Sequence, residues 1–391
     1  MIDRTRVMGI IAEHESTLRR VSAEIHAHPE LLNEETYAAQ LLSEELDRAG
    51  FQVERGVAGL PTAIRAIYPV RSQGPTIAIL GEYDALPEIG HACGHNLIAA
   101  AGLGAAIALG ELKTDLPGTV MFLGTPAEEG GGGKVVMVEQ GVFEGIDAAM
   151  MFHPANHTMV SWGSLAISEV EIAFRGRPSH ASAEPHKGIN ALDAVIQTFN
   201  GINALRQHIL DGARIHGIIT NGGAKPNIVP EFASALFYVR AEDTSYRDEL
   251  LEKLRACAAG AAIATGATLD FHEIGYSYKA MKPNAPLEKR FEENLQELGE
   301  TIRPPERRML GSTDMGDVSQ VVPAIHPYLQ ICDEQVATHS RPFADAAISE
   351  RGQRAMLTAA TALALTAADV LTDPQLVESM WNAFGEPSRS P

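Results

Sequence analysis

Residues 76–96 read TIAILGEYDALPEIGHACGHN, and the run TIAIL at their start is short and almost wholly apolar. A run of this length and composition is typical of a strand that is buried on both faces of a sheet. The residues that follow include Glu82, Asp84, Glu88, His91, Cys93 and His95. So many carboxyl, thiol and imidazole groups exceed what a core strand or helix can bury unpaired. The stretch therefore predicts a buried strand that leads directly into a functional loop.

The pattern of an apolar run followed by polar groups occurs twice more. TVMFLG at 119–124 leads to Glu128 and Glu129, and DAAMMF at 147–152 leads to His153. A helix rich in Ala, Gly and Leu is expected between the first two runs, and the order strand, helix, strand indicates an open, mostly parallel sheet. Ligands of such sheets bind outside the carboxyl ends of the strands. The three polar groups are therefore expected to share one rim of the sheet.

The character of the sequence changes at about residue 166. The run AISEVEIAFRG alternates apolar and polar residues, as a half-exposed antiparallel strand does. Helices and further strand-like runs follow until prolines interrupt regular structure after about residue 276. We therefore predict an α/β catalytic domain over 1–165 and 277–391, in which helices flank a mostly parallel sheet. A smaller α+β domain over 166–276 is inserted into it.

The composition argues against several classes of partner. The chain has 391 residues with 31 Lys+Arg against 50 Asp+Glu, a formal net charge of −19, and no basic stripe that could follow phosphates. Its N-terminus lacks the pattern of a secretory signal, and its longest apolar runs are shorter than the roughly 20 residues of a membrane span. The three cysteines give no disulfide framework. We expect a cytoplasmic protein that binds neither nucleic acid nor a membrane.

Two pairs of residues carry the chemistry of the predicted rim. Cys93 and His95 open a helix, where a thiolate is stabilised, and their spacing lets both reach a borderline-soft metal such as zinc. Glu128 and Glu129 are adjacent carboxylates in a loop, where their repulsion favours a nearby cation. One carboxylate can hold the metal while the other acts as general base for a water molecule.

Several other motifs are incomplete. The run GGGGK resembles a phosphate-binding loop, but that motif requires glycine at position 128 and a hydroxyl group at Val135. The run GLGAAI fails the dinucleotide-binding pattern at Ile107, and neither H-E-x-x-H nor G-x-S-x-G occurs. Two alternatives stay open: a hydrolase in which Cys93 is the nucleophile, and a metal-binding scaffold without catalysis.

An ordered series of motifs spans nearly the whole chain. It comprises IHAHPELLNEE, GEYDALP, GHACGHN, TPAEEGGGGK, MFHP, GRPSHAS, KPNIVPEFA, GSTDMGDVS and THSRPF. The series resembles the di-metal peptidases that include aminoacylase and carboxypeptidase G. Within that group the chain is similar to the amidohydrolases of N-acyl amino acids, namely auxin-conjugate hydrolases, aminobenzoyl-glutamate hydrolase and Xaa-Arg dipeptidases.

The resemblance implies a role for each matching residue. It implies that two divalent metals are held by Cys93, His95, Glu129, His153 and His339. Glu128 is expected as general base and acid, and Asp84 as the carboxylate that orients the coordinated groups. The substrate's carboxylate and oxyanion are expected to contact His180, Asn227 and Arg240 of the inserted domain, with His180 reaching into the partner subunit's site. The inserted domain is expected to serve as a lid and to form a homodimer.

Two departures from the family pattern concern the rim. Asn96 stands where many relatives have aspartate, which favours the aminobenzoyl-glutamate hydrolase and dipeptidase side of the group. Glu82 stands where distant relatives have a metal-binding histidine, and we do not count it as a ligand. Three further histidines, His26, His28 and His326, are interpreted as structural or supporting, and Asp314 and Asp317 as loop residues that line the site at most.

The residues and the resemblance together predict a metal-dependent amidohydrolase. Its expected substrate is a small N-acyl amino acid or dipeptide-like molecule with a free carboxylate, of the aminobenzoyl-glutamate or Xaa-amino acid type. Zinc suits the thiolate ligand, and manganese, cobalt or nickel are the alternatives that relatives accept.

Overall fold

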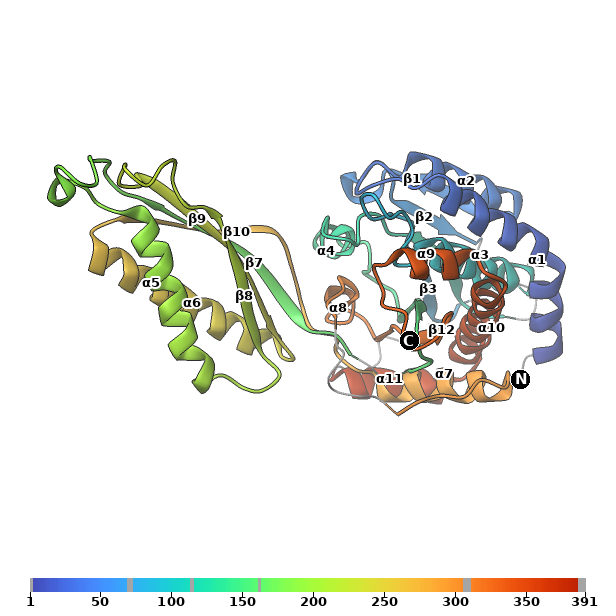
Figure 1. Ribbon diagram of the computed structural model, residues 1–391. Coiled ribbons are helices and arrows are strands. Elements are labelled where there is room, and N and C mark those ends of the chain that lie inside the picture. The colour runs from blue at the N-terminus through green and yellow to red at the C-terminus, as the bar shows by residue number, and fades with distance from the viewer. Residues whose placement is uncertain (1–2, 69–72, 113–115, 161–162, 305–310, 386–391) are drawn as a thin grey trace. The chain divides into compact units, whose positions relative to one another are not determined.

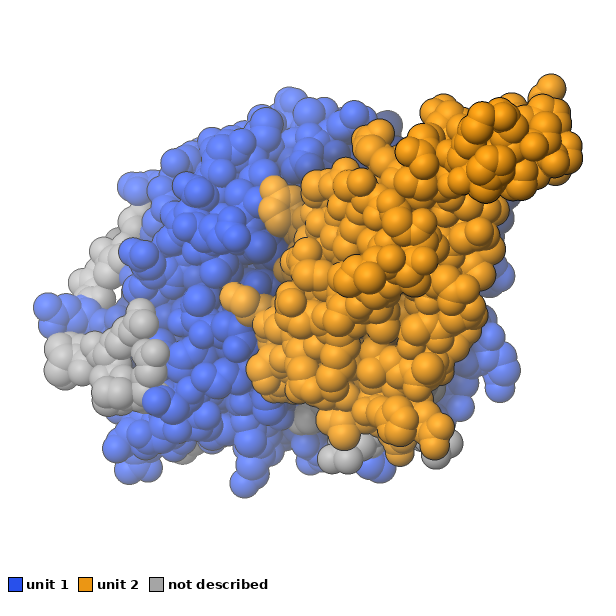
Figure 2. Space-filling model, turned by 90° about the vertical axis from the view of Figure 1, so that its left-hand side faces the viewer, with its two compact units in different colours: residues 1–163, 281–310, 314–391 blue, residues 164–280, 311–313 orange. Residues whose placement is uncertain are grey.

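The computed structural model describes residues 3–68, 73–112, 116–160, 163–304 and 311–385. The chain forms two compact units, which Figure 2 colours separately. Unit 1 comprises Met1–Gly163, Met281–Leu310 and Asp314–Pro391, and unit 2 comprises Ser164–Ala280 and Gly311–Thr313. The predicted insert, 166–276, lies within unit 2, and its roles as lid and in dimerisation stay predictions.

Unit 1 is built on a mainly parallel six-stranded sheet, which confirms the predicted fold class. The strand order is β1-β2-β4-β3-β5-β11, where neighbours β4, β3, β5 and β11 run parallel and β1 and β2 pair antiparallel at one edge. The strands are β1 (Gln52–Arg55), β2 (Ile64–Ile67), β3 (Thr76–Gly81), β4 (Thr119–Gly124), β5 (Ala148–Met150) and β11 (Ala324–Ile325). A separate parallel pair consists of β6 (His153–Ala155) and β12 (Tyr328–Gln330).

Helices surround this sheet (Figure 1). They are α1 (Arg4–Ala27), α2 (Thr36–Arg48), α3 (His95–Glu111), α4 (Gly133–Glu139), α7 (Ala285–Glu297), α8 (Met315–Val318), α9 (Arg341–Ile348), α10 (Glu350–Thr372) and α11 (Pro374–Phe384). The central one is α3, which is buried from its first residue to Gly110 and packs on β3 and β4 as well as on α1 and α10. This explains why its sequence is apolar on every side.

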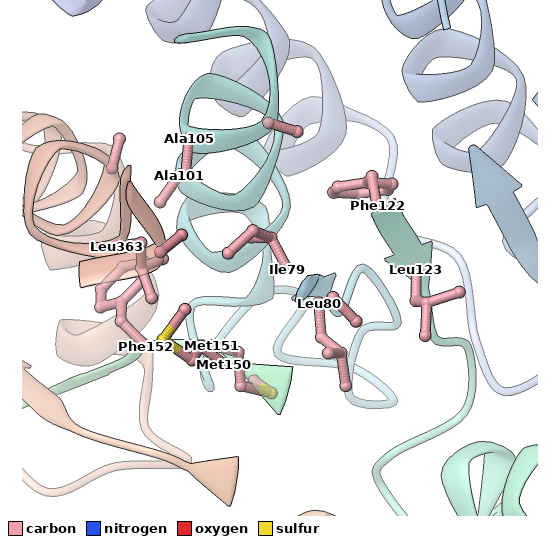
Figure 3. Packing of buried hydrophobic residues seen from close by; sticks show 14 of the residues in the cluster. Ile79, Leu80, Ala101, Ala105, Phe122, Leu123, Met150, Met151, Phe152 and Leu363 are labelled. Carbon is pink, nitrogen blue, oxygen red and sulfur yellow. The ribbon is translucent and has the colours of Figure 1, made fainter. Parts of the chain in front are cut away.

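The core between α3 and the sheet depends on small residues. Figure 3 shows Ala101 and Ala105 of α3 in the same cluster as Ile79 of β3, Phe122 of β4 and Leu363 of α10. At Gly102 the helix lies so close to the sheet that a β-carbon would stand 2.7 Å from the carbonyl oxygen of Leu80. This close approach packs α3 tightly on β3. The loop between the end of β3 and His95, the first residue of α3, therefore lies beside both elements.

Helix α10 contains the apolar run AMLTAATALALTAADVL but is longer than the run itself. With 23 residues it is long and apolar enough to cross a membrane by length and composition alone, in contrast to our expectation. However, 78% of its most apolar window is buried inside the protein. Helix α10 packs on α1, α3 and α7, which is the position of a core helix in a globular protein.

Unit 2 is an antiparallel sheet with two helices on it, as the alternating sequence pattern predicted. The sheet has the order β10-β7-β9-β8. Its elements are β7 (Ala166–Arg175), α5 (Ala191–Leu205), β8 (Arg214–Asn221), β9 (Phe232–Ala241), α6 (Thr244–Thr265) and β10 (Thr268–Tyr278). Buried Val170, Ile172 and Phe174 of β7 contribute to a core that both helices cover (Figure 1).

We expect Gly102→Ala to lower the free energy of unfolding, because the added methyl group meets the Leu80 carbonyl. Overpacking of this kind costs about 1–3 kcal/mol, against a gain of up to about 1 kcal/mol from helix propensity. Gly9→Ala is the matched control, since a β-carbon added at that α1 position would have no atom within 4 Å. It should stabilise the protein by about 0.5–1 kcal/mol. Urea unfolding of both variants tests the contrast, and equal shifts would disprove it.

Candidate metal centre

The structure brings the polar groups that follow β3, β4 and β5 together at one rim of the sheet. Asp84 lies just beyond the end of β3, and Glu128 and Glu129 lie in the loop after β4. His153 opens β6 directly after β5. Because β3, β4 and β5 are parallel, their carboxyl ends lie at the same edge. His339, from the loop before α9, joins them through its backbone N–H, which donates to the carbonyl oxygen of Ala92 at 3.0 Å.

Their donor atoms form three overlapping sets in which all atoms lie within 4.8 Å of one another. The sets are Cys93, His95 and His153; Cys93, Glu129 and His339; and His95, Glu128 and Glu129. Cys93 belongs to the first two sets, and its Sγ lies 3.3 Å from Nε2 of His153. The five residues expected as metal ligands are therefore neighbours in space.

Local backbone geometry makes the Cys93–His95 arrangement possible. Gly94 separates the two residues with φ at 80°, in the left-handed region that favours glycine. A β-carbon at Gly94 would also lie 2.5 Å from Cγ of Pro154. Glycine is thus required both for the turn into α3 and for the close approach of the loop that carries His153.

The histidines are oriented so that one ring nitrogen of each stays available. Nδ1 of His95 lies 2.9 Å from both the carbonyl and a carboxylate oxygen of Asp84, which leaves Nε2 as the coordinating atom. Nδ1 of His153 lies 2.7 Å from the carbonyl oxygen of Pro154, so that its Nε2 faces Cys93. Burial lowers the pKa of His153 to about 4, and the imidazole is neutral, the form that binds metals.

Asp84 also holds the loop that carries Glu129. Its second carboxylate oxygen accepts the backbone N–H of Glu129 at 3.0 Å. Oε1 of Glu129 lies 3.5 Å from Nε2 of His339. His339 has φ at 58°, an uncommon conformation for a residue with a side chain and one that clusters at functional sites.

The residues of this rim fit two divalent metal ions. Nε2 of His95 and Oε1 of Glu129 are buried, and within the described chain neither has a hydrogen-bond partner. Unpaired buried polar atoms are costly unless a ligand satisfies them. Thiolate, imidazole and carboxylate donors are the combination that zinc and similar divalent transition metals bind.

The environment of Cys93 differs from our expectation. We expected the helix N-terminus to lower the pKa of its thiol. Burial instead raises the pKa of Cys93 well above its usual value, and the charge of Glu129 acts in the same direction. A buried thiol is a poor nucleophile unless a cation stabilises the thiolate. The geometry therefore favours Cys93 as a metal ligand over Cys93 as the attacking group.

Glu128 occupies a different environment from its neighbour Glu129. It is 9% exposed, and burial raises its pKa well above the usual value, with the charges of Glu82 and Glu129 adding to the effect. A carboxyl group with a raised pKa beside a donor set is suited to accept and return a proton near neutral pH.

A buried network that sequence reasoning missed lies beside Glu128. Nζ of Lys134 donates to Glu82 at 2.5 Å and to Asp314 at 2.7 Å, and all three side chains are fully buried. The lysine is the last residue of the GGGGK run. Because its ammonium group pairs with two buried carboxylates, no phosphate ligand is needed to account for this run. Oxygen atoms of Glu82, Glu128 and Asp314 also lie within 4.8 Å of one another. Lys134 supplies the positive charge that such a cluster needs.

His326 was interpreted as structural or supporting, and the structure places it beside His153 at the rim. Its ring centroid lies 5.4 Å from that of His153, and it is 6% exposed. Both of its ring nitrogens are buried, and no partner for them exists in the part of the chain that the structure describes. A signal was present in the sequence, because His153 and His326 are each followed by proline. His153 is the first residue of β6, and His326 lies two residues before its partner strand β12.

The predicted substrate-binding residues all belong to unit 2. The backbones of His180 and Asn227 are neighbours, since the carbonyl oxygen of Asn227 accepts the N–H of Ala181 at 3.1 Å. Both side chains are exposed. Arg240 lies half-buried on β9 and donates to Ser312 at 3.3 Å. Its Nε has no partner among the described residues, and it forms no ion pair with them.

Unpaired donor atoms around a buried thiol, beside a carboxyl group with a raised pKa, are the features of a metal-dependent hydrolase. The chain belongs to Peptidase family M20/M25/M40, whose family model matches residues 78–362.

Curated relatives support this membership. The chain is 39% identical over 397 residues to "Xaa-Arg dipeptidase" of Mus musculus, covering 97% of this chain and 92% of the relative. It is 38% identical to one subunit of the p-aminobenzoyl-glutamate hydrolase of Escherichia coli (strain K12), covering 71% of this chain and 62% of the relative.

Solved structures share the fold. A dinuclear metal-binding M20 peptidase of Bacillus subtilis has a TM-score of 0.70 at 22% identity, covering 92% of this chain and 99% of that one. An aminobenzoyl-glutamate utilization protein of Klebsiella pneumoniae has a TM-score of 0.68 at 21% identity, covering 89% of this chain and 96% of that one.

Proposed function

We propose that the protein hydrolyses the amide bond of dipeptides or N-acyl amino acids that carry a free carboxylate, with Glu128 as general base and acid. The observation that carries this proposal is the different placement of two adjacent glutamates. Both glutamates share a donor set with His95, but only Glu129 also lies in a set with Cys93 and His339. Only Glu128 also lies close to Glu82 and Asp314, and its pKa is raised. One glutamate can therefore bind metal while the other transfers protons.

The relatives support this substrate class. Those named above are a dipeptidase and an aminobenzoyl-glutamate hydrolase, and a further relative at 29% identity is an N-acetyl-L-cysteine deacetylase of Bacillus subtilis. Each of these names describes cleavage of an amide bond to an amino acid or its derivative. We propose that the present chain shares the substrate class of the dipeptidases and aminobenzoyl-glutamate hydrolases.

In the proposed mechanism, two divalent metal ions would be held by Cys93, His95, Glu129, His153 and His339. When bound, the metals supply Lewis acidity towards the amide carbonyl and make a water molecule more acidic. Glu128 takes a proton from the attacking water as the new C–O bond forms. It then delivers that proton to the nitrogen of the leaving amine as the C–N bond breaks. Asp84 keeps His95 and Glu129 oriented throughout.

Zinc is the metal that we propose, because a thiolate and three imidazoles are among the donors. Manganese, cobalt and nickel accept the same donors and are the alternatives to test.

Unit 2 is proposed to bind the carboxylate end of the substrate. Arg240 supports this role, because its half-buried guanidinium has an unpaired Nε and no acidic partner within the described ranges. A guanidinium is well suited to hold a carboxylate. His180 and Asn227 are proposed to contact the substrate's carboxylate or oxyanion, and unit 2 to act as a lid.

The first experiment is a comparison of amide hydrolysis before and after chelation, on protein with reduced thiols and with a panel of dipeptides, aminobenzoyl-glutamate and N-acyl amino acids. We expect chelation to abolish hydrolysis and one divalent cation to restore it, with the highest kcat/KM for a substrate that has a free carboxylate. Matched substrates with an amidated carboxyl group are the control. Activity that survives metal removal but is lost to a thiol-blocking reagent would instead identify Cys93 as the nucleophile.

The two glutamates should respond differently to the same change. Glu128→Gln should lower kcat by about 10²–10⁴-fold, the usual contribution of a general acid–base group, while both metals stay bound. Glu129→Gln should lose metal as well as activity. The metal content of both purified variants is measured by elemental analysis, together with their kcat. A metal-free Glu128→Gln protein would contradict the expectation.

We also propose that the protein is a cytoplasmic homodimer that pairs through strand β8. This strand is the edge of the unit 2 sheet, and it exposes 63% of Ile218 and 46% of Ile219. Exposed apolar edge strands are prone to pair with a second chain. Ile218→Arg should therefore shift the molar mass in light scattering from dimer to monomer. Ile263→Arg on α6, where the side chain is 85% exposed, should leave the mass unchanged.

A further inference from the structure

Three buried carboxylates bind the backbone of the loop that carries Glu128 and Glu129. The N–H of Ala127 donates to Glu35 at 2.9 Å, the N–H of Glu129 donates to Asp84 at 3.0 Å, and the N–H of Lys134 donates to Asp314 at 2.9 Å. The three acids come from different parts of unit 1. The loop is therefore held at its start, at its middle and at its end by separate side chains.

Glu35 differs from the other two acids of this group. Asp84 contacts His95 and Asp314 pairs with Lys134, whereas Glu35 belongs to neither the donor sets nor the Lys134 network. It is fully buried at the start of α2, far from Ala127 in the sequence. Its Oε2 accepts the hydroxyl of Thr62 at 2.8 Å, and its Oε1 accepts the N–H groups of Asn33 at 3.0 Å and Ala127 at 2.9 Å. No cation pairs with it among the residues described.

A buried carboxylate without a cation is an expensive way to stabilise a fold. Apolar side chains of similar size usually serve stability equally well or better. The carboxylate does provide something that an apolar group cannot, since an ionised acceptor makes strong, directional hydrogen bonds to backbone N–H groups. Those bonds have a clear target, which is the backbone directly before Glu128.

Ala127 needs such support. Its φ is 58°, in the left-handed region that residues with a β-carbon seldom adopt. Its methyl group also lies against Gly131, where a β-carbon would stand 2.5 Å away. This tight, uncommon turn sets the direction in which the next residue, Glu128, leaves the backbone.

We propose that Glu35 is a positioning residue for Glu128, acting through its hydrogen bond to the N–H of Ala127. Asp84 fixes Glu129 independently, so that loss of the Glu35 bond misplaces the base without releasing the metal ligand. The inference rests on the proposed role of Glu128 in amide hydrolysis.

Two conservative variants separate the hydrogen bond from the charge. Glu35→Gln removes the charge but keeps an amide oxygen for Ala127 and an NH₂ group that can donate to Thr62. Glu35→Asp keeps the charge but draws the carboxylate back by one methylene group, out of reach of Ala127. Thr62→Val is the control, because it removes a partner of Glu35 and leaves the Ala127 bond in place.

We expect kcat of Glu35→Asp to fall at least about tenfold, with KM within about threefold and both metals bound, because a displacement of about 1 Å costs this much or more. Glu35→Gln and Thr62→Val should keep kcat within about threefold. The opposite order, with Glu35→Gln impaired and Glu35→Asp active, would overturn the proposal. So would unchanged kcat in Glu35→Asp, because a merely structural residue affects stability alone.

Hydrogen exchange gives a readout that needs no substrate. The amide of Ala127 should exchange faster in Glu35→Asp than in the unmodified protein or in Glu35→Gln, while that of Glu129 should not change. Equal exchange at Ala127 in all three proteins would sink the positioning role. If the unmodified protein fails to hydrolyse any amide, the proposed function fails, whereas the exchange result still decides whether Glu35 holds the loop.

Discussion

The carboxylate of Asp84 is the interaction on which the centre depends. One oxygen faces Nδ1 of His95 at the start of α3, and the other accepts the backbone N–H of Glu129 after β4. Burial acts to raise the pKa of Asp84, but His95 and the N–H of Glu129 lower it below its usual value. The side chain is therefore an anion in the core, held by two groups that each belong to a different metal-binding element. Because β3 and β4 are parallel neighbours, these two contacts of Asp84 fix the distance between the proposed ligands His95 and Glu129.

The buried acids of unit 1 are satisfied in three physically distinct ways. Glu35 uses only neutral N–H and O–H donors, and Glu82 and Asp314 share the ammonium of Lys134. Glu82 and Glu129 each keep one buried oxygen without a hydrogen-bond partner in the described chain, and each of these oxygens lies 3.5 Å from a histidine Nε2. An oxygen of this third kind is suited to a metal ion. Among the described residues, the buried carboxylate oxygens without a hydrogen-bond partner belong to Glu82 and Glu129, at one rim of the sheet.

Sequence reasoning located the core strands and the polar rim because both leave local signals. The runs at 76–80 and 119–124 are uninterrupted and apolar, and they form β3 and β4. Strands β1 and β2 were not predicted, since an edge strand such as QVER at Gln52–Arg55 is short, polar and mostly exposed. The two residues of β11 are too few to produce any pattern.

The positions of supporting residues could not be predicted, because their partners are distant in the sequence. Nothing near Glu35 indicates a bond to Ala127, and nothing near Lys134 indicates Asp314. The pKa of Cys93 was expected to fall because only its helix was considered, whereas burial raises it. Periodicity and motif spacing describe one segment at a time, while these properties depend on segments that meet only in the folded chain.

The interruption of unit 1 by unit 2 also determines when the centre can exist. Cys93, His95 and Glu129 precede unit 2, whereas Asp314 and His339 follow it. At ~5–20 residues per second on the ribosome, Cys93 is made roughly ten to fifty seconds before His339. Strand β5 likewise waits for β11, its neighbour in the sheet. The donor set of Cys93, His95 and His153 is complete before unit 2 is made, whereas the set of Cys93, Glu129 and His339 is completed only when almost all of the chain has been synthesised.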